Sequence, residues 1–255
     1  MSRRHLTFAC EGELLVGTLD EAAGAAGLLI VSGGNEVRGG AWNGQALLAA
    51  RLASRGIPVF RFDRRGVGDS TGENRGFREE GADIAAALAT FRRAVPGMER
   101  VFGFGNCDAA SALMLGHGCG LDGLVLSNPW TIEDEAAPAP PAALRAHYAR
   151  RLRDPAALLR LVRGRISLPG LAGSLRAMAR PAAPTTLAGE ISGGLAGFGG
   201  PVAILLAARD RTAQAFLAQW NKSDPRLATC AGASHSYVEG PAREWLFEQI
   251  ITAVS

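Results

Sequence analysis

The sequence is poor in aromatic residues and carries little net charge, and both facts exclude broad classes of protein. Aromatic side chains make up 6% of the 255 residues, and the formal net charge is +3. A nucleic-acid-binding surface needs a denser basic stripe with interleaved aromatic residues. No apolar run reaches the roughly 18 residues that cross a bilayer. We therefore expect no nucleic-acid partner and no membrane span.

Cysteine is also scarce, and its spacing argues against two of its common uses. The four cysteines, at positions 10, 107, 119 and 230, form no CxxC pair, and together with the histidines they do not fall at zinc-ligand spacing. The basic N-terminal segment is followed by acidic residues, where a signal peptide would have an apolar core. Free thiols in a reducing cytoplasm are the simplest interpretation. We expect a cytoplasmic protein that binds no metal.

Short apolar strands alternate with helices along most of the chain. Apolar residues make up 47% of the sequence, enough for a sizeable core. Strands are predicted at residues 6–10, 14–20, 28–31, 59–62, 101–104, 124–126, 202–207 and 227–230. Helices are predicted at residues 41–55, 79–95, 108–115, 212–221 and 242–254. This alternation predicts an α/β fold with a mainly parallel central sheet and helices on both faces.

The alternation breaks between residues 131 and 200. This stretch has prolines at positions 138, 140 and 141, then arginine-rich helical segments, then a glycine-rich run that ends at Gly200. We predict a helical lid, or cap, over residues 131–200. It would be inserted between an N-terminal part of the core at 1–130 and a C-terminal part at 201–255.

The stretch from Val101 to Ala110 predicts a nucleophile. A strand stops at Gly105, Cys107 follows two residues later, and a helix of small residues begins at once. A sharp turn from strand to helix requires small neighbours and exposes its apex side chain above the sheet. The layout is that of the G-x-S-x-G elbow, with cysteine in place of serine and Ala109 in place of the last glycine. A structural cysteine that packs like a hydrophobic residue is the alternative.

A thiol nucleophile needs a base, and the base needs an orienting acid. His235 is the preferred base, because it lies in the loop directly after the last predicted strand, where parallel sheets place their active sites. Asp210 follows the strand at 202–207 and is the preferred acid. The acidic run at 133–135 stays open as the alternative acid, and helix capping is an alternative role for Asp210. The chain order is Cys107, Asp210, His235.

An oxyanion hole needs backbone N–H groups aimed at the developing negative charge. One should come from Asp108, the residue after the nucleophile. The other should come from the loop after the strand at 28–31, at Gly34 or Asn35, where glycines let the backbone approach a substrate closely.

Together these features resemble the α/β-hydrolase superfamily over essentially the whole chain. They comprise the segment Asp-Arg-Arg-Gly-Val-Gly-Asp-Ser at 63–70, the elbow, Asp210 and His235. More narrowly, the segments at 32–36, 105–111 and 128–130 resemble the exosortase A system-associated hydrolases of type 1. That group is encoded with exopolysaccharide and protein-sorting loci. The resemblance implies an α/β-hydrolase fold and a hydrolase without a defined substrate.

We therefore expect an enzyme that cleaves a small-molecule ester or thioester through Cys107, His235 and Asp210, with no cofactor. Acyl transfer to a sugar or another acceptor is a second hypothesis. A non-catalytic scaffold on a hydrolase fold is a third, because a fold alone does not confer a function. The separation of the Cys107 sulfur from the His235 ring distinguishes a catalytic site from a scaffold. The oligomeric state is open.

Overall fold

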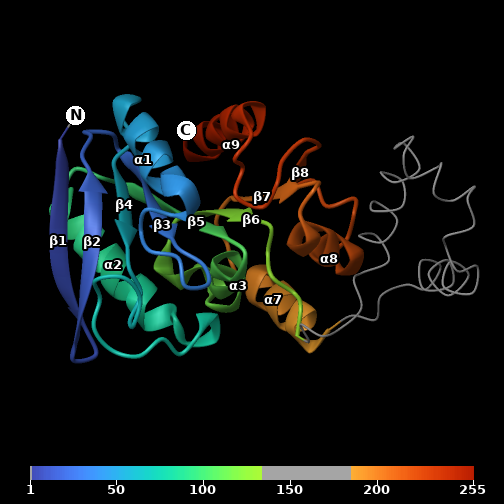
Figure 1. Ribbon diagram of the computed structural model, residues 1–255, viewed down its shortest axis with the longest axis horizontal. Coiled ribbons are helices and arrows are strands. Elements are labelled where there is room, and N and C mark those ends of the chain that lie inside the picture. The colour runs from blue at the N-terminus through green and yellow to red at the C-terminus, as the bar shows by residue number, and fades with distance from the viewer. Residues whose placement is uncertain (1, 134–184) are drawn as a thin grey trace, which may run out of the picture.

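The computed structural model describes residues 2–133 and 185–255, in which strands and helices alternate as predicted (Figure 1). The strands are β1 (Arg3–Cys10), β2 (Glu13–Asp20), β3 (Ala26–Val31), β4 (Val59–Phe62), β5 (Arg100–Asn106), β6 (Gly123–Ser127), β7 (Val202–Ala207) and β8 (Leu227–Cys230). The helices are α1 (Gly44–Ser54), α2 (Gly81–Ala94), α3 (Asp108–Leu115), α7 (Thr186–Ala196), α8 (Arg211–Gln219) and α9 (Gly240–Val254). Short 3-10 turns are η1 (Ala41–Asn43), η2 (Phe77–Glu79) and η3 (His117–Gly120).

The eight strands of the described residues belong to one sheet, in the order β1-β2-β4-β3-β5-β6-β7-β8. The hairpin β1–β2 is antiparallel and joins β4 in an antiparallel pair, whereas β4, β3, β5, β6, β7 and β8 are parallel to one another. The predicted mainly parallel sheet is confirmed. Its carboxyl ends meet at one edge, which is where ligands bind in open α/β sheets.

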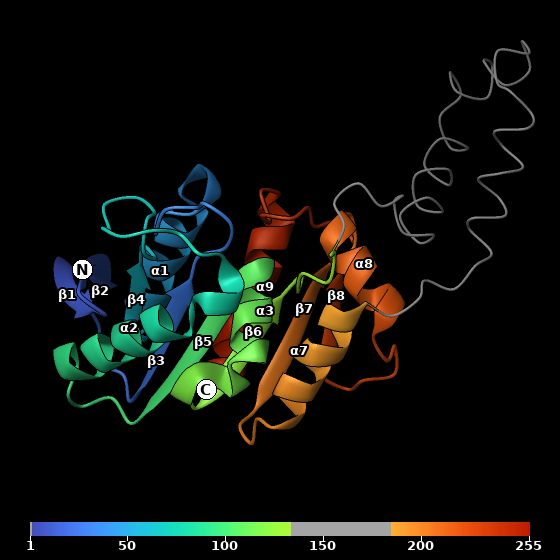
Figure 2. The same ribbon diagram turned by 90° about the horizontal axis from the view of Figure 1, so that it is seen from below.

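Helices cover both faces of the sheet, and each face has its own hydrophobic cluster (Figures 1 and 2). Helices α1 and α9 pack on one face, against Leu28, Phe102 and Phe104 among others. Helices α2, α3, α7 and α8 pack on the other, against Leu29 and Val101 among others. None of these described helices has the length and apolarity that crossing a bilayer requires.

Helix α7 was not predicted, and it changes the extent of the predicted lid. Its apolar side chains are buried in the same cluster as those of α3, and Thr185 caps its first turn by accepting a hydrogen bond from the Ala188 amide. Residues 186–196 therefore belong to the core, although the lid was predicted to extend to residue 200. The rest of that prediction falls mainly on residues 134–184, which lie outside the described residues.

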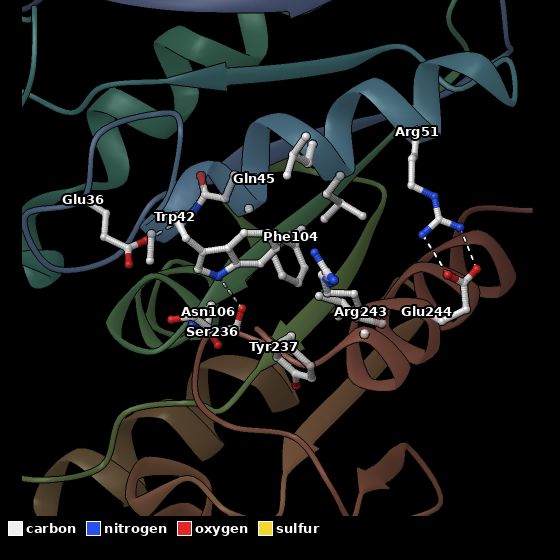
Figure 3. Close-up of a pocket in the computed structure, with 16 residues that line it drawn as sticks. Glu36, Trp42, Gln45, Arg51, Phe104, Asn106, Ser236, Tyr237, Arg243 and Glu244 are labelled. Carbon is white, nitrogen blue, oxygen red and sulfur yellow. Dashed lines mark hydrogen bonds and ion pairs between the residues drawn. The ribbon is translucent and has the colours of Figure 1, made fainter.

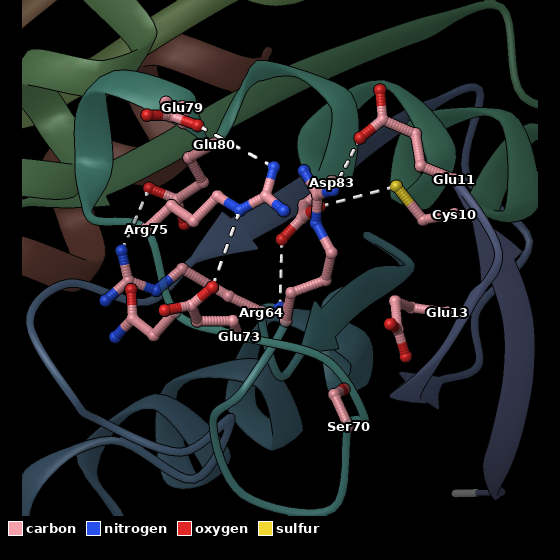
Figure 4. A network of polar contacts seen from close by, with 12 residues as sticks. Cys10, Glu11, Glu13, Arg64, Ser70, Glu73, Arg75, Glu79, Glu80 and Asp83 are labelled. Atoms are coloured by element: carbon pink, nitrogen blue, oxygen red, sulfur yellow. Dashed lines mark hydrogen bonds and ion pairs between the residues drawn. The ribbon is translucent and has the colours of Figure 1, made fainter.

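The loop after β4 is held against α2 by buried charged groups (Figure 4). Arg64 pairs with Glu80 at 3.2 Å, and Asp83 accepts hydrogen bonds from the Arg65 side chain at 2.6 Å and from its amide at 2.9 Å. Burial raises the pKa of Glu80 to about 8, although Arg64 opposes the shift. Because η2 immediately precedes Glu80 and contacts α3, this network fixes a wall beside the helix that begins at the elbow.

The crossing of β5 and α3 depends on a glycine. A Cβ atom on Gly105 would lie 2.7 Å from the carbonyl carbon of Ala109 and 2.8 Å from its oxygen. Both neighbours are backbone atoms, which cannot rotate away. Gly105 therefore permits the close approach that the predicted elbow requires.

We expect Gly105→Ala to lower the free energy of unfolding by about 1–3 kcal/mol, because the strand and helix must separate to admit the methyl group. Urea denaturation measures the change. Gly189→Ala is the matched control, since its Cβ in α7 would meet no atom within 4 Å. It should stabilise the protein by about 0.5–1 kcal/mol. Equal effects of the two substitutions would exclude the steric explanation.

Candidate active site

Cys107 lies at the apex of the turn between β5 and α3, in a strained conformation. Its φ is 66° and its ψ is −128°, which is sparsely populated by residues other than glycine. The surrounding backbone holds it there. The Cys107 amide donates to Ser127 O at 2.9 Å, and its carbonyl accepts from the amides of Ser111 and Trp130 at 3.3 and 3.2 Å. Strain of this kind is concentrated at functional sites, and it agrees with the predicted elbow.

His235 and Asp210 lie together at the carboxyl end of the sheet. The Nδ1 atom of His235 is 2.9 Å from Oδ2 of Asp210, which is itself buried. Asp210 also caps α8, because its carboxylate accepts hydrogen bonds from the amides of Thr212 and Ala213, each at 3.2 Å. The two roles proposed for Asp210 are therefore compatible in one side chain.

Cys107 lies close enough to the ring of His235 to affect its pKa. Hydrogen bonds with Asp210, the larger cause, and with Cys107 raise the pKa of His235 to about 10, and burial opposes the shift. The two side chains that were predicted to act with His235 are therefore the two that raise its pKa.

Two asparagines that sequence reasoning missed connect the histidine loop to the sheet. Nδ2 of Asn106 lies 3.3 Å from His235 O and 3.4 Å from its Nε2. Buried Asn128 donates to Asn106 Oδ1 at 2.9 Å and to His235 O at 3.3 Å, and its own Oδ1 accepts from the Ala207 amide. The signal was present in the sequence, because Asn106 ends one strand and Asn128 directly follows the next.

The other candidate acids and histidines lie elsewhere or outside the described residues. Glu133 accepts a hydrogen bond from the Leu187 amide at 2.7 Å, so it anchors the start of α7. His5 pairs with Thr18 in the β1–β2 hairpin, and His117 lies beyond the C-terminal end of α3. Positions 134, 135 and 147 are not among the described residues.

The predicted oxyanion loop is occupied by a side chain of the protein itself. The Gly34 amide donates to both carboxylate oxygens of Asp108, at 2.8 and 3.0 Å. The Asn35 side chain accepts from Nδ2 of Asn74 at 2.8 Å. The prediction considered only the backbone of Asp108, and it needs this correction: the Gly34 N–H is not free to receive a substrate oxygen. The amide is nevertheless oriented toward an anionic oxygen.

Taken together, the site places a thiol, an imidazole and a carboxylate in series. That order can provide a nucleophile, a group that moves its proton, and a group that orients the imidazole. In residues 2–133 and 185–255, no group of three or more His, Cys, Asp or Glu side chains is arranged to hold a metal ion.

Comparisons with known proteins agree on the fold. A model of the alpha/beta hydrolase family matches residues 28–246. An esterase of Pyrococcus furiosus has a TM-score of 0.64 at 14% identity, with 98% of this chain and 90% of that chain covered. An alpha-beta serine hydrolase homologue from Coxiella burnetii has a TM-score of 0.60 at 15% identity, with 100% and 99% covered.

The thioesterase domain from the curacin biosynthetic pathway is also similar in structure. Its TM-score is 0.58 at 13% identity, with 99% of this chain and 100% of that chain covered. At such identities the likeness concerns the fold. The chain matches no curated protein at a significant level.

The charge of Asp210 can be separated from its capping role by Asp210→Asn, because asparagine caps helices but carries no charge. We expect the pKa of His235 to fall from about 10 toward its ordinary value of 6.5, as followed by NMR titration of the ring. Since the folded-state pKa lies above the unfolded one, the stabilisation by this contact is complete below about pH 6.5 and is lost as the pH rises toward 10. Urea denaturation at the two ends of this range tests that sign.

Asp210→Ala is the companion variant, and it should lose about 0.5–2 kcal/mol more than Asp210→Asn because the cap is also removed. An unchanged titration of His235 in Asp210→Asn would show that Asp210 is not the source of the raised pKa.

Proposed function

Because the chain belongs to the alpha/beta hydrolase family, we propose that it cleaves an ester or thioester through an acyl-thioester intermediate on Cys107. One observation carries the proposal. His235 is held by Asp210 at 2.9 Å, and Cys107, at the apex of a strained turn, lies close enough to affect the pKa of the histidine. This proximity supports an enzyme rather than a scaffold that merely shares the fold.

In the acylation step, the Cys107 thiolate attacks the substrate carbonyl carbon. A C–S bond forms, and the carbonyl electron pair moves onto oxygen. When the tetrahedral intermediate collapses, the bond to the leaving group breaks, and the His235 imidazolium gives its proton to the departing oxygen or sulfur. Asp210 keeps the ring in the orientation that presents Nε2 to the reaction.

In the deacylation step, neutral His235 accepts a proton from water as the water oxygen attacks the thioester carbonyl. The C–S bond breaks, the carboxylic acid leaves, and the thiolate–imidazolium pair is restored. All proton transfers use His235, so no cofactor is needed. In the alternative reaction, acyl transfer, a sugar or another acceptor would take the place of water in this step.

The Asp108 carboxylate opposes this chemistry in the arrangement described above. A substrate oxygen that is to bind the Gly34 amide must first displace the Asp108 carboxylate from it. An anionic carboxylate next to the hole also disfavours a second negative charge there. We therefore propose that Asp108 restrains acylation and must rotate away before the oxyanion forms.

The narrower resemblance to the exosortase A system-associated hydrolases of type 1 rests on the motif residues alone. The family model and the solved structures support the superfamily and do not extend to that group. A role beside exopolysaccharide or protein-sorting loci is therefore only what the motifs suggest.

Covalent labelling tests the nucleophile. With an activated acyl ester, wild-type protein should gain one acyl group on Cys107, detected by intact-mass spectrometry and peptide mapping. Cys107→Ala should gain none, and its kcat should fall by at least about a thousandfold. Cys230→Ala is the matched control, since Cys230 is also a free, half-buried thiol at a strand end. Equal labelling of wild type and Cys107→Ala would refute the assignment.

Replacing Asp108 tests its restraining role. We expect Asp108→Ala to raise the acylation rate about tenfold, since a single oxyanion donor contributes about a hundredfold or more to kcat. Stopped-flow measurement of the first turnover reports acylation separately from deacylation. Glu73→Ala removes an equal charge from an exposed position and should leave the rate unchanged. A slower first turnover in Asp108→Ala would overturn the restraint and indicate a supporting role.

A further inference from the structure

A cavity of about 490 Å³ opens between α1 and α9 (Figure 3). Cys107 does not line it. Its chain neighbour Asn106 does, and so does Ser236, the neighbour of His235. The volume lies in the range of about 300–1,000 Å³ typical of small-molecule sites. The cavity therefore borders the candidate active site through these two neighbours, on the face of the sheet opposite α3.

The walls of this cavity are mostly apolar. They include the side chains of Trp42, Leu47, Leu48, Phe104 and Leu246. Trp42 and Leu47 are 38% and 52% exposed, although large apolar residues in a soluble fold are usually covered. Apolar surface that is left uncovered in a concave site indicates an apolar ligand.

Polar groups mark the two ends of the cavity. Glu36 and Gln45 lie at the end near Asn106, where Gln45 also bonds the Ser32 hydroxyl at 3.0 Å. The opposite end carries the ion pair of Arg51 with Glu244, at 2.6 Å. The α1 residues that line the cavity extend from Gly44 to Arg51, which at about 1.5 Å per residue is about 10 Å.

The rim of the cavity is built with strained backbone. Trp42 has a φ of 48° and Tyr237 a φ of 51°, in the left-handed region. The indole Nε1 of Trp42 donates to Ser236 O at 3.1 Å, and the guanidinium of Arg243 lies 5.2 Å from its ring centroid. These contacts hold the indole in one position and join this rim to the histidine loop.

We propose that the cavity holds a linear, medium-length acyl chain of about eight carbons, the length that about 10 Å of α1 accommodates. The acyl group stays bound through both reaction steps, whereas the leaving group must depart after the first. A mostly apolar cavity therefore suits the acyl group. The inference rests on the proposed acyl chemistry at Cys107 and names its substrate class.

Chain-length dependence tests the proposal. With 4-nitrophenyl esters of 2 to 12 acyl carbons, kcat/KM should rise by up to about fourfold per added CH₂ and stop rising near the octanoyl ester. Leu47→Glu should lower kcat/KM for the octanoyl ester about tenfold more than kcat/KM for the acetyl ester. Leu14→Glu is the matched control, because Leu14 lies in the β1–β2 hairpin with a similar exposure of 47%. Equal losses for both esters, or the same loss in Leu14→Glu, would overturn the proposal.

Binding without chemistry separates this inference from the proposed function. In Cys107→Ala, 8-bromooctanoate should quench tryptophan fluorescence by contact with Trp42, and the further substitution Trp42→Phe should remove that quenching. Leu47→Glu should weaken the binding about tenfold. Quenching together with an unlabelled Cys107 in wild type would refute the thiol chemistry and leave the cavity as a ligand site. Acylated Cys107 with no quenching at saturating probe would refute the cavity as the acyl site.

Discussion

The close crossing of β5 and α3 is the constraint on which the site depends. Because Gly105 carries no side chain, the first turn of α3 packs directly on the strand, and Cys107 must adopt a positive φ to connect them. Hydrogen bonds to Ser127 and Trp130 hold this turn from the side of β6. The position of the thiol is therefore a property of sheet packing rather than of a free loop. Strain at one residue is tolerated because its neighbours over-determine it.

Much of the fold could be predicted from local pattern, because parallel strands buried on both faces read as short apolar runs between turns. The same logic placed Asp210 and His235 at strand ends, where the structure brings them together. Helix α7 was not predicted because glycine disfavours a helix on every propensity scale. One of them, Gly194, permits α7 to lie against α3, since a Cβ there would meet Met114 O at 2.2 Å. Tertiary packing outweighed propensity in this segment.

The Asp108 carboxylate illustrates a different limit of sequence reasoning. An acidic residue in the first turn of a helix is ordinary, because it complements the helix dipole. Its neighbour across space, the Gly34 amide, lies 74 residues away in the chain. A local sequence pattern does not show that two residues so far apart in the chain meet in space. A backbone role for Asp108 could therefore be predicted from the sequence, and the contact of its side chain could not. The same holds for the link from Asn128 through Asn106 to His235.

The alternation of side chains along β5 explains why the turn at Cys107 and the apolar cavity lie next to each other. Successive residues of a strand face opposite sides. Gly103 and Gly105 face α3, where absent side chains allow the helix to approach. Phe102, Phe104 and Asn106 face the other side, where Phe104 and Asn106 line the cavity beneath α1 and α9. A strand with small residues on one face and large residues on the other thus builds the strained turn at Cys107 and an apolar wall within one residue of each other. The turn at Cys107 and the cavity wall both follow from the two-residue alternation of side chains along β5.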